Sequence, residues 1–122
     1  MLIATLVLAG AIGAPTRYFI DGWVQRHASG VFPWGTFVIN VTGSFLLGVI
    51  TGLSLYHGFG LVPKTATGTG FCGAYTTFST FSYETIRLVE EGSIQPALAN
   101  AGGSVVIGLA AAALGLSLTA LI

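Results

Sequence analysis

The sequence predicts an all-α membrane protein with four transmembrane helices, and two observations lead to this fold class. Hydrophobic residues make up 53% of the 122 residues and charged residues only 7%, whereas roughly 25% of an average soluble domain is charged. The charged residues also separate long uncharged runs, and a membrane-spanning helix needs roughly 17–25 residues. We therefore expect a single transmembrane domain over residues 1–122, with approximate spans at 2–18, 32–55, 61–83 and 94–121.

The first span could be mistaken for a cleavable signal peptide, because Ala9-Gly10-Ala11 resembles a cleavage site. A signal peptide normally begins with a positively charged region. No Lys or Arg precedes this apolar stretch. We therefore expect the first helix to be retained.

The second span carries small and polar residues at every fourth position, so that they share one helix face. These residues are Thr36, Asn40, Ser44, Gly48 and Gly52, and the fourth span repeats the pattern with Asn100, Ser104, Gly108 and Ala112. Small residues let helices approach closely, which predicts a packing role for the glycines. Asn40 differs, because its amide carries two donor hydrogens and an acceptor that all need partners in hydrocarbon. Helix packing would explain Asn40, but we favour a role in a polar pathway.

Within the third span, the stretch from Gly70 to Phe81 mixes glycines, hydroxyls and aromatic rings instead of Leu, Ile and Val. Polar groups at membrane depth are tolerated mainly where they face protein or line a cavity. The glycines predict a helix break near Gly73, which would free backbone carbonyls to bind a small hard cation. Residues 68–73 also match the dinucleotide-binding pattern G-x-G-x-x-G, but that pattern needs a preceding strand in a βαβ unit, which this chain lacks.

Beyond the predicted break, aromatic rings alternate with hydroxyl side chains. Phe78 and Phe81 are three residues apart and would share a helix face, and Thr76, Thr77, Ser79 and Thr80 lie among them. A packing stripe would explain the rings alone. An aromatic ring, however, has a positive edge that can contact an anion, and hydroxyl donors can replace part of its hydration shell. The segment therefore favours a pathway for a small anion.

The distribution of Lys and Arg barely favours either orientation in the membrane. With four spans, both termini and the 56–63 connection share one side, which carries Lys64, while Arg17, Arg26 and Arg87 belong to the other. Such a bias normally sets orientation, but here it is weak. Either another signal sets the orientation, or the protein inserts both ways and assembles as an antiparallel pair. Four short helices alone can hardly enclose a polar pathway, so we favour a homodimer.

Three motifs together resemble the Fluc (CrcB-type) fluoride channel family over the whole chain. The first is Gly10-Ala-Ile-Gly-Ala-Pro-Thr-Arg17-Tyr18, with Ala11 where a second glycine is usual. The second is Gly35-Thr-Phe-Val-Ile-Asn40-Val-Thr-Gly-Ser-Phe45, and the third is Gly70-Phe-Cys-Gly-Ala-Tyr-Thr-Thr-Phe-Ser-Thr-Phe81. The third is the most specific of them.

The resemblance implies a fluoride-selective channel that lets toxic fluoride leave the cytoplasm passively across the cell membrane. It implies an antiparallel, dual-topology dimer with two pores and a central structural sodium ion. The sequence leaves open a partnership with an oppositely oriented paralogue.

The resemblance also assigns roles to single residues. The implied fluoride pathway comprises Asn40, Phe78, Ser79, Thr80, Phe81 and Ser104. Gly73 and Thr76 would give backbone carbonyls to sodium, Arg17 would lie at the vestibule, and Glu84 would lie near the other end of the third helix. In the fourth span, Asn100 stands where the family commonly has Tyr, and Gly108 replaces a Ser, so the polar track of that helix departs from the family pattern.

Other functions fit the sequence less well. A proton-coupled multidrug exporter needs an ionisable group in the membrane centre, typically in the first helix, and residues 1–16 contain none. A non-transporting assembly subunit would not need the Asn40 amide or the hydroxyls of residues 76–80. An enzyme is disfavoured because His27 and His57 lie near span ends without a nucleophile or carboxylate beside them. The net charge of zero gives no electrostatic basis for binding nucleic acid.

Overall fold

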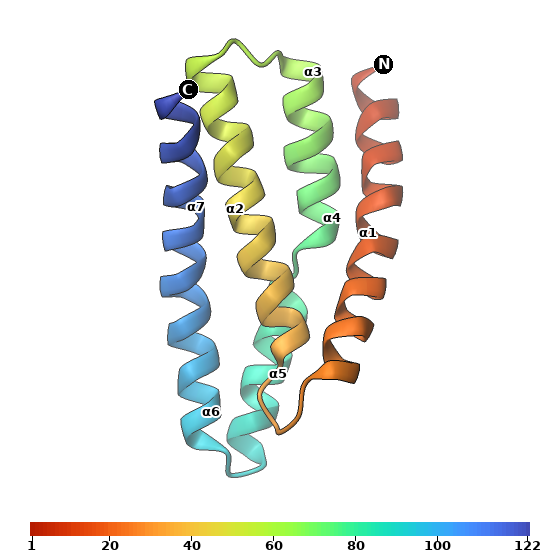
Figure 1. Cartoon of the computed structure of the whole chain (residues 1–122). Helices are drawn as coiled ribbons and strands as arrows, with labels where there is room; N and C mark the ends of the chain where they lie inside the picture. Colours follow the sequence, from red (N-terminus) through yellow and green to blue (C-terminus); the bar gives the residue numbers. More distant parts are fainter.

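A computed structural model describes residues 1–122 as an up-and-down bundle of four membrane segments (Figure 1). The first two segments are the helices α1 (Leu2–His27) and α2 (Trp34–Tyr56). The third comprises α3 (Leu61–Lys64), the π-helical stretch η1 (Thr65–Cys72), α4 (Gly73–Tyr75) and α5 (Phe78–Glu90), and the fourth comprises α6 (Ile94–Leu98), the π-helical stretch η2 (Ala99–Gly103) and α7 (Ser104–Leu121). Both termini lie at one end of the bundle with the connection between α2 and α3.

Two segments differ from the expected spans: the first is longer, and the break in the third lies at a slightly different position. α1 continues to His27, well beyond residue 18. Three helices are long and apolar enough to cross a membrane, namely Leu2–His27, Trp34–Tyr56 and Ile94–Leu121. The third segment is not one continuous helix, in agreement with the predicted break. The break lies slightly beyond the expected position near Gly73, because Gly73 is still helical and the chain leaves the helix at Thr76 and Thr77.

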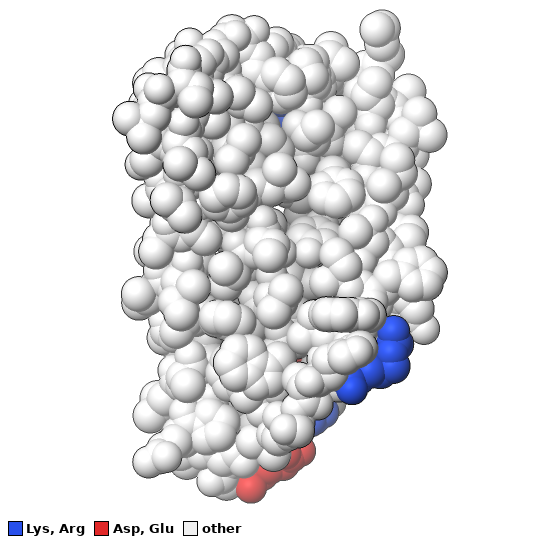
Figure 2. Space-filling model, in the orientation of Figure 1, with Lys and Arg blue, Asp and Glu red and all other residues white.

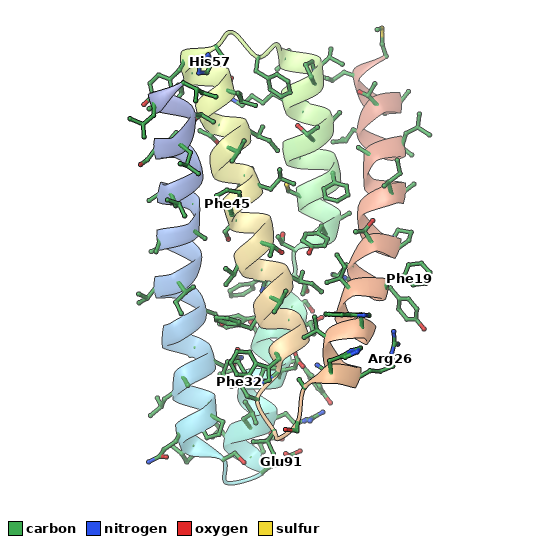
Figure 3. All side chains as sticks on the ribbon, in the orientation of Figure 1. Phe19, Arg26, Phe32, Phe45, His57 and Glu91 are labelled. Carbon is green, nitrogen blue, oxygen red and sulfur yellow. The ribbon has the colours of Figure 1, made fainter.

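The outer surface of the bundle is apolar along most of its length. Figure 2 shows an almost uncharged face, with Lys, Arg, Asp and Glu visible mainly at the end opposite the termini. Large hydrophobic side chains are exposed on this surface, including Phe19 of α1 and Leu109 of α7, and Phe19 projects away from the bundle in Figure 3. Such a surface suits a lipid bilayer or a second membrane protein.

Glycines allow α2 and α7 to pack against each other with little separation. A Cβ atom at Gly48 would overlap the backbone of Ala112, and one at Gly115 would overlap the carbonyl of Phe45. A Cβ at Gly52 would likewise overlap the Thr119 side chain. This close backbone approach confirms the packing role predicted for the glycines of the second span.

Candidate functional site

The helix break in the third segment is stabilised by the side chain of Asn40 on α2. Thr76 and Thr77 have extended backbone angles, with φ and ψ of −80° and 163° at Thr76 and −148° and 123° at Thr77. Asn40 Nδ2 donates to the Thr77 carbonyl at 2.9 Å, and Asn40 Oδ1 accepts the Thr77 backbone N–H, also at 2.9 Å. Unpaired backbone groups are costly in a membrane interior. The Asn40 amide therefore replaces the hydrogen bonds that Thr77 would have made in a helix.

The break also removes the regular helical donors of carbonyl groups before it, and those of Gly73 and Thr76 are among them. In a continuous helix each N–H donates to the carbonyl four residues earlier, so Thr77 would donate to Gly73 and Thr80 to Thr76. Instead, the Thr77 N–H donates to Asn40 Oδ1, and the Thr80 N–H donates to the Thr77 hydroxyl at 3.1 Å. The Gly73 and Thr76 carbonyl oxygens are thus left without their helical donors.

These two carbonyls are among the oxygen ligands that the chain could offer to a cation at the break. No three His, Cys, Asp or Glu side chains come together at a possible metal site. Carbonyl oxygens at a helix break suit small hard cations such as sodium. A sodium ion held by the Gly73 and Thr76 carbonyls therefore fits this donor set.

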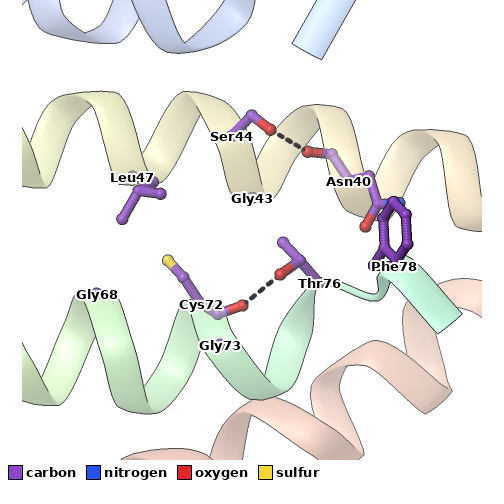
Figure 4. Close-up of a pocket in the computed structure, with 9 residues that line it drawn as sticks. All are labelled: Asn40, Gly43, Ser44, Leu47, Gly68, Cys72, Gly73, Thr76 and Phe78. Atoms are coloured by element: carbon purple, nitrogen blue, oxygen red, sulfur yellow. Dashed lines mark hydrogen bonds between the residues drawn. The ribbon is translucent and has the colours of Figure 1, made fainter. Parts of the chain in front are cut away.

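A cavity of about 330 Å³ lies beside the break, between α2 and the third segment (Figure 4). Its lining residues are Asn40, Gly43, Ser44, Leu47, Gly68, Cys72, Gly73, Thr76 and Phe78. Phe78 is the first residue of α5, so the N-terminus of that helix, with its partial positive charge, lies at the cavity. Gly73 is exposed and Phe78 is 79% exposed. One chain therefore leaves the cavity open on this side.

The predicted aromatic pair forms on α5. The ring centroids of Phe78 and Phe81 are 6.0 Å apart with an interplanar angle of 47°, which confirms that the two rings share a helix face. Ser79 and Thr80 are exposed in the first turn of the same helix. The structure thus brings ring edges, hydroxyl donors and the Asn40 amide to one part of the bundle, a combination suited to contacts with a small anion.

A second, smaller cavity of about 160 Å³ lies between α1, α2 and the break. It is lined by Ala14, Arg17, Tyr18, Asp21, Thr36, Ile39, Thr77 and Thr80. Arg17 and Thr80, both predicted site residues, therefore line one cavity. Thr77 lines it as well, and Thr77 is paired with Asn40, which lines the larger cavity. The two hydrogen bonds between Asn40 and Thr77 therefore join a residue that lines the larger cavity to one that lines the smaller cavity.

Sequence reasoning did not find a role for two residues that line this smaller cavity. The hydroxyl of Thr36, which is buried, donates to Glu84 Oε1 across 48 residues of sequence. Asp21 has a buried carboxylate oxygen, Oδ1, without a hydrogen-bond partner. A Cβ at Gly35 would overlap this oxygen, so Gly35 makes room for Asp21. The expected first span ends at residue 18 and so excludes Asp21. A first helix extended to His27, as α1 is, would have included it.

Ser104 is placed differently from the other predicted pathway residues. It lines neither cavity, and its hydroxyl donates to Asn100 Oδ1 at 3.2 Å. Asn100 is completely buried, and its Nδ2 donates to the Thr85 hydroxyl at 2.8 Å. Ser104 therefore belongs to a hydrogen-bond network between the fourth segment and α5.

Comparison with known proteins extends over almost the whole chain. Residues 4–116 match the family described as CrcB-like protein, Camphor Resistance (CrcB). The chain is 50% identical to "Fluoride-specific ion channel FluC 1" of Frankia casuarinae over 122 residues, covering 93% of this chain and 92% of that protein.

Two further relatives extend this pattern. Identity is 54% with the protein of the same name from Streptomyces avermitilis, covering 88% of this chain and 87% of that one. It is 50% with "Fluoride-specific ion channel FluC" of Pyrococcus horikoshii, covering 81% and 80%. With its membrane-crossing helices, the chain is thus a multi-pass protein of the cell membrane and a transporter-type protein, not an enzyme, and it belongs to the CrcB-like family.

Proposed function

We propose that this protein is a fluoride-selective channel through which toxic fluoride leaves the cytoplasm passively. The observation that carries the proposal is the helix break held by Asn40 beside Phe78, because it gathers amide, hydroxyl and ring-edge donors without a fixed positive charge. Names of relatives about 50% identical over most of their length support fluoride as the ion. Fluoride is small and strongly hydrated, so directional donors must replace its water.

Each proposed pathway residue has a chemical part in this scheme. Asn40 uses one Nδ2 hydrogen for the Thr77 carbonyl and retains a second for the anion. The edges of Phe78 and Phe81 contact fluoride without the charge that would trap it. Ser79 and Thr80 supply hydroxyls beside the rings, Ser104 extends the polar side chains along the fourth segment, and Arg17 attracts anions at the vestibule.

The channel works as an antiparallel dimer with two pores. Support comes from the open side of the larger cavity, where Gly73 is exposed and Phe78 is 79% exposed. A polar pathway in a bilayer needs walls on all sides, and a second copy would supply the missing wall at each cavity. We favour a homodimer, with an oppositely oriented paralogue as the alternative partner.

A structural sodium ion lies between the two chains in this proposal. The Gly73 and Thr76 carbonyls of each chain, which lack their helical donors, would hold it from both sides. Sodium would neutralise the partial negative charge of these oxygens at the break. It would thereby join the two copies at the point where each third segment is interrupted.

Flux measurements on purified protein in liposomes test the proposal. Fluoride should leave loaded liposomes much faster than chloride, and a proton ionophore should not be required. A proton-coupled exporter needs an ionisable group in the membrane, and the long α1 contains Asp21. Measuring whether the flux requires protons therefore also tests the exporter alternative. Equal fluoride and chloride flux, or no flux from properly assembled protein, would contradict the proposal.

A matched pair of variants tests the aromatic assignment in the same assay. Phe81→Ile removes a ring edge from the proposed pathway and should lower fluoride flux while the dimer remains assembled. Phe19→Ile makes the same change at an exposed ring on α1 (69% exposed) and should leave flux unchanged. Similar flux from both variants would remove Phe81 from the pathway.

A further inference from the structure

The Asn100 side chain is the most thoroughly buried polar group in the bundle. It is 0% exposed and is one of the three largest fully buried side chains, with Ile39 and Leu88. It lies in the π-helical stretch η2, and π-helical turns inside α-helices are frequent at functional sites. A buried amide in an apolar bundle is costly unless its polar atoms are bonded. The partners of Asn100 therefore indicate what it does.

These partners form a continuous series of hydrogen bonds that ends at Phe81. Ser104 donates to Asn100 Oδ1 at 3.2 Å, and Asn100 Nδ2 donates to Thr85 Oγ1 at 2.8 Å. The Thr85 hydroxyl in turn donates to the Phe81 carbonyl at 2.8 Å. A hydroxyl has one hydrogen, so the Thr85 hydrogen is committed to Phe81 and its lone pair accepts from Asn100. We call Asn100, Thr85 and Ser104 the Asn100 network.

The position of α5 depends on a small number of such bonds. Thr77, which caps α5, is bonded to Asn40, and Glu84 accepts the Thr36 hydroxyl. Leu88 is the only buried residue of this 13-residue helix. The half of α5 that carries Phe78 and Phe81 therefore has little apolar packing to hold it against the bundle. The side-chain hydrogen bonds between α5 and the fourth segment come from the Asn100 network, which reaches this half through the bond from Thr85 to the Phe81 carbonyl.

We propose that Asn100 is a positioning residue that sets the place of Phe81 through Thr85. It does not bind fluoride itself. By fixing the backbone of α5 against the fourth segment, it holds the Phe81 ring edge at the distance that favours a small anion over chloride. This inference rests on the proposed function, and it gives Asn100, which stands where the family commonly has Tyr, a role outside the anion pathway.

Variants of Thr85 provide the sharpest test, because they alter the network without removing the buried amide. Thr85→Val should lower the fluoride-to-chloride flux ratio by about 2- to 10-fold, the factor that one net hydrogen bond represents. Asn100→Leu should lower it to a similar extent. The double variant should be no worse than either single variant, because each single variant already breaks the Asn100–Thr85 bond that links the fourth segment to α5. Thr85→Ser, which keeps the hydroxyl, should have the same fluoride-to-chloride flux ratio as the unmodified protein.

Thr51→Val is the matched control for Thr85→Val. The Thr51 hydroxyl also donates to the carbonyl four residues earlier, that of Leu47, at 2.8 Å, but it accepts nothing from another helix. This variant should keep the ratio of the unmodified protein. If Asn100→Leu abolishes fluoride flux while Thr85→Val keeps both rate and ratio, Asn100 acts on the anion directly and the inference is wrong. If Asn100→Leu does not assemble, Thr85→Val decides alone.

A readout without fluoride separates this inference from the proposed function. 4-Fluorophenylalanine at position 81 should give a ¹⁹F resonance that shifts in Thr85→Val and stays in place in Thr51→Val. If the unmodified protein conducts no fluoride, the proposed function fails, while the ¹⁹F comparison still decides whether the network positions Phe81. An unshifted resonance in Thr85→Val would overturn the inference.

Discussion

At the scale of single residues, Asn40 has the largest structural consequence. Its amide makes two hydrogen bonds to the backbone of Thr77, 37 residues away, and thereby stabilises an extended stretch in the middle of a membrane bundle. Its own backbone carbonyl accepts the Ser44 hydroxyl at 2.7 Å. One side chain thus satisfies the break and keeps a second donor hydrogen without a partner in the chain, beside the cavity that it lines.

Asn40→Asp should reduce fluoride flux strongly. The carboxylate can still accept the Thr77 N–H, but it loses the donor to the Thr77 carbonyl and puts a negative charge on the proposed anion pathway. Losing a bond and leaving a buried carbonyl unpaired costs about 1–3 kcal/mol, so we expect a flux decrease of roughly tenfold or more. Flux should be measured with the dimer content of each sample.

Asn40→Gln provides a second arm for this prediction. Gln keeps the amide but is longer by one methylene, so it cannot make both Thr77 bonds in the same place. We expect partial activity between that of the Asp variant and the unmodified protein. Full activity of Asn40→Asp in assembled dimers would show that Asn40 is not on the anion pathway.

At the scale of elements, two kinds of contact build the bundle. α2 and α7 pack along glycines that allow close backbone approach, as at Gly48 against Ala112. The third segment is held instead by polar contacts at its break. Glycine seams are rigid because they are close-packed, whereas a segment attached by separate hydrogen bonds can be adjusted by single substitutions. Four of the proposed pathway residues lie on the second kind of element, namely Phe78, Ser79, Thr80 and Phe81.

Gly48→Ala should destabilise the protein by separating α2 from α7. The new methyl group would meet backbone atoms of Ala112, which cannot rotate away, and overpacking of this kind costs about 1–3 kcal/mol. Gly102→Ala is the control, because no atom lies within 4 Å of the Cβ that it adds. Heating followed by size-exclusion chromatography should show earlier loss of the native peak for Gly48→Ala only. Equal loss for both variants would refute the packing role of Gly48.

At the scale of the whole molecule, charged side chains of both signs lie mainly toward the end opposite the termini. Figure 3 places Arg26 and Glu91 at one end and His57 at the other, near the C-terminus. His57 bonds the Thr119 carbonyl at 2.7 Å and so joins the ends of α2 and α7. The connections between segments are short, and the Lys and Arg bias that orients membrane proteins is weak. We therefore expect insertion in both orientations, as the proposed antiparallel dimer requires.

Cysteine labelling should detect both orientations in one sample. Cys72, the only native cysteine, is buried, and Cys72→Ala removes it as background. Gly60→Cys at the terminal end and Glu90→Cys at the opposite end would each add one exposed thiol. In intact cells, a membrane-impermeant maleimide should label about half of each variant if the orientation bias is negligible. Complete labelling of one variant and none of the other would establish a single orientation.

Local composition was sufficient to predict much of this architecture. Apolar runs between sparse charges predicted the helical membrane segments, since length and hydropathy are properties of contiguous residues. The mixture of glycine, hydroxyl and aromatic residues in the third segment predicted that it is interrupted. The spacing of Phe78 and Phe81 predicted their contact, because it depends only on the helix period.

Only the tertiary structure decided where the interruption falls and what holds it. The break lies at Thr76 and Thr77, a few residues beyond Gly73, because the replacement hydrogen bonds come from Asn40 on another helix. The same reason applies to the Thr36–Glu84 and Asn100–Thr85 bonds, which join residues 48 and 15 positions apart. Sequence by itself determined that the third segment is polar and broken, since both depend on neighbouring residues. Packing of distant segments determined which atoms the break leaves free, since a backbone group is free only when no other helix reaches it.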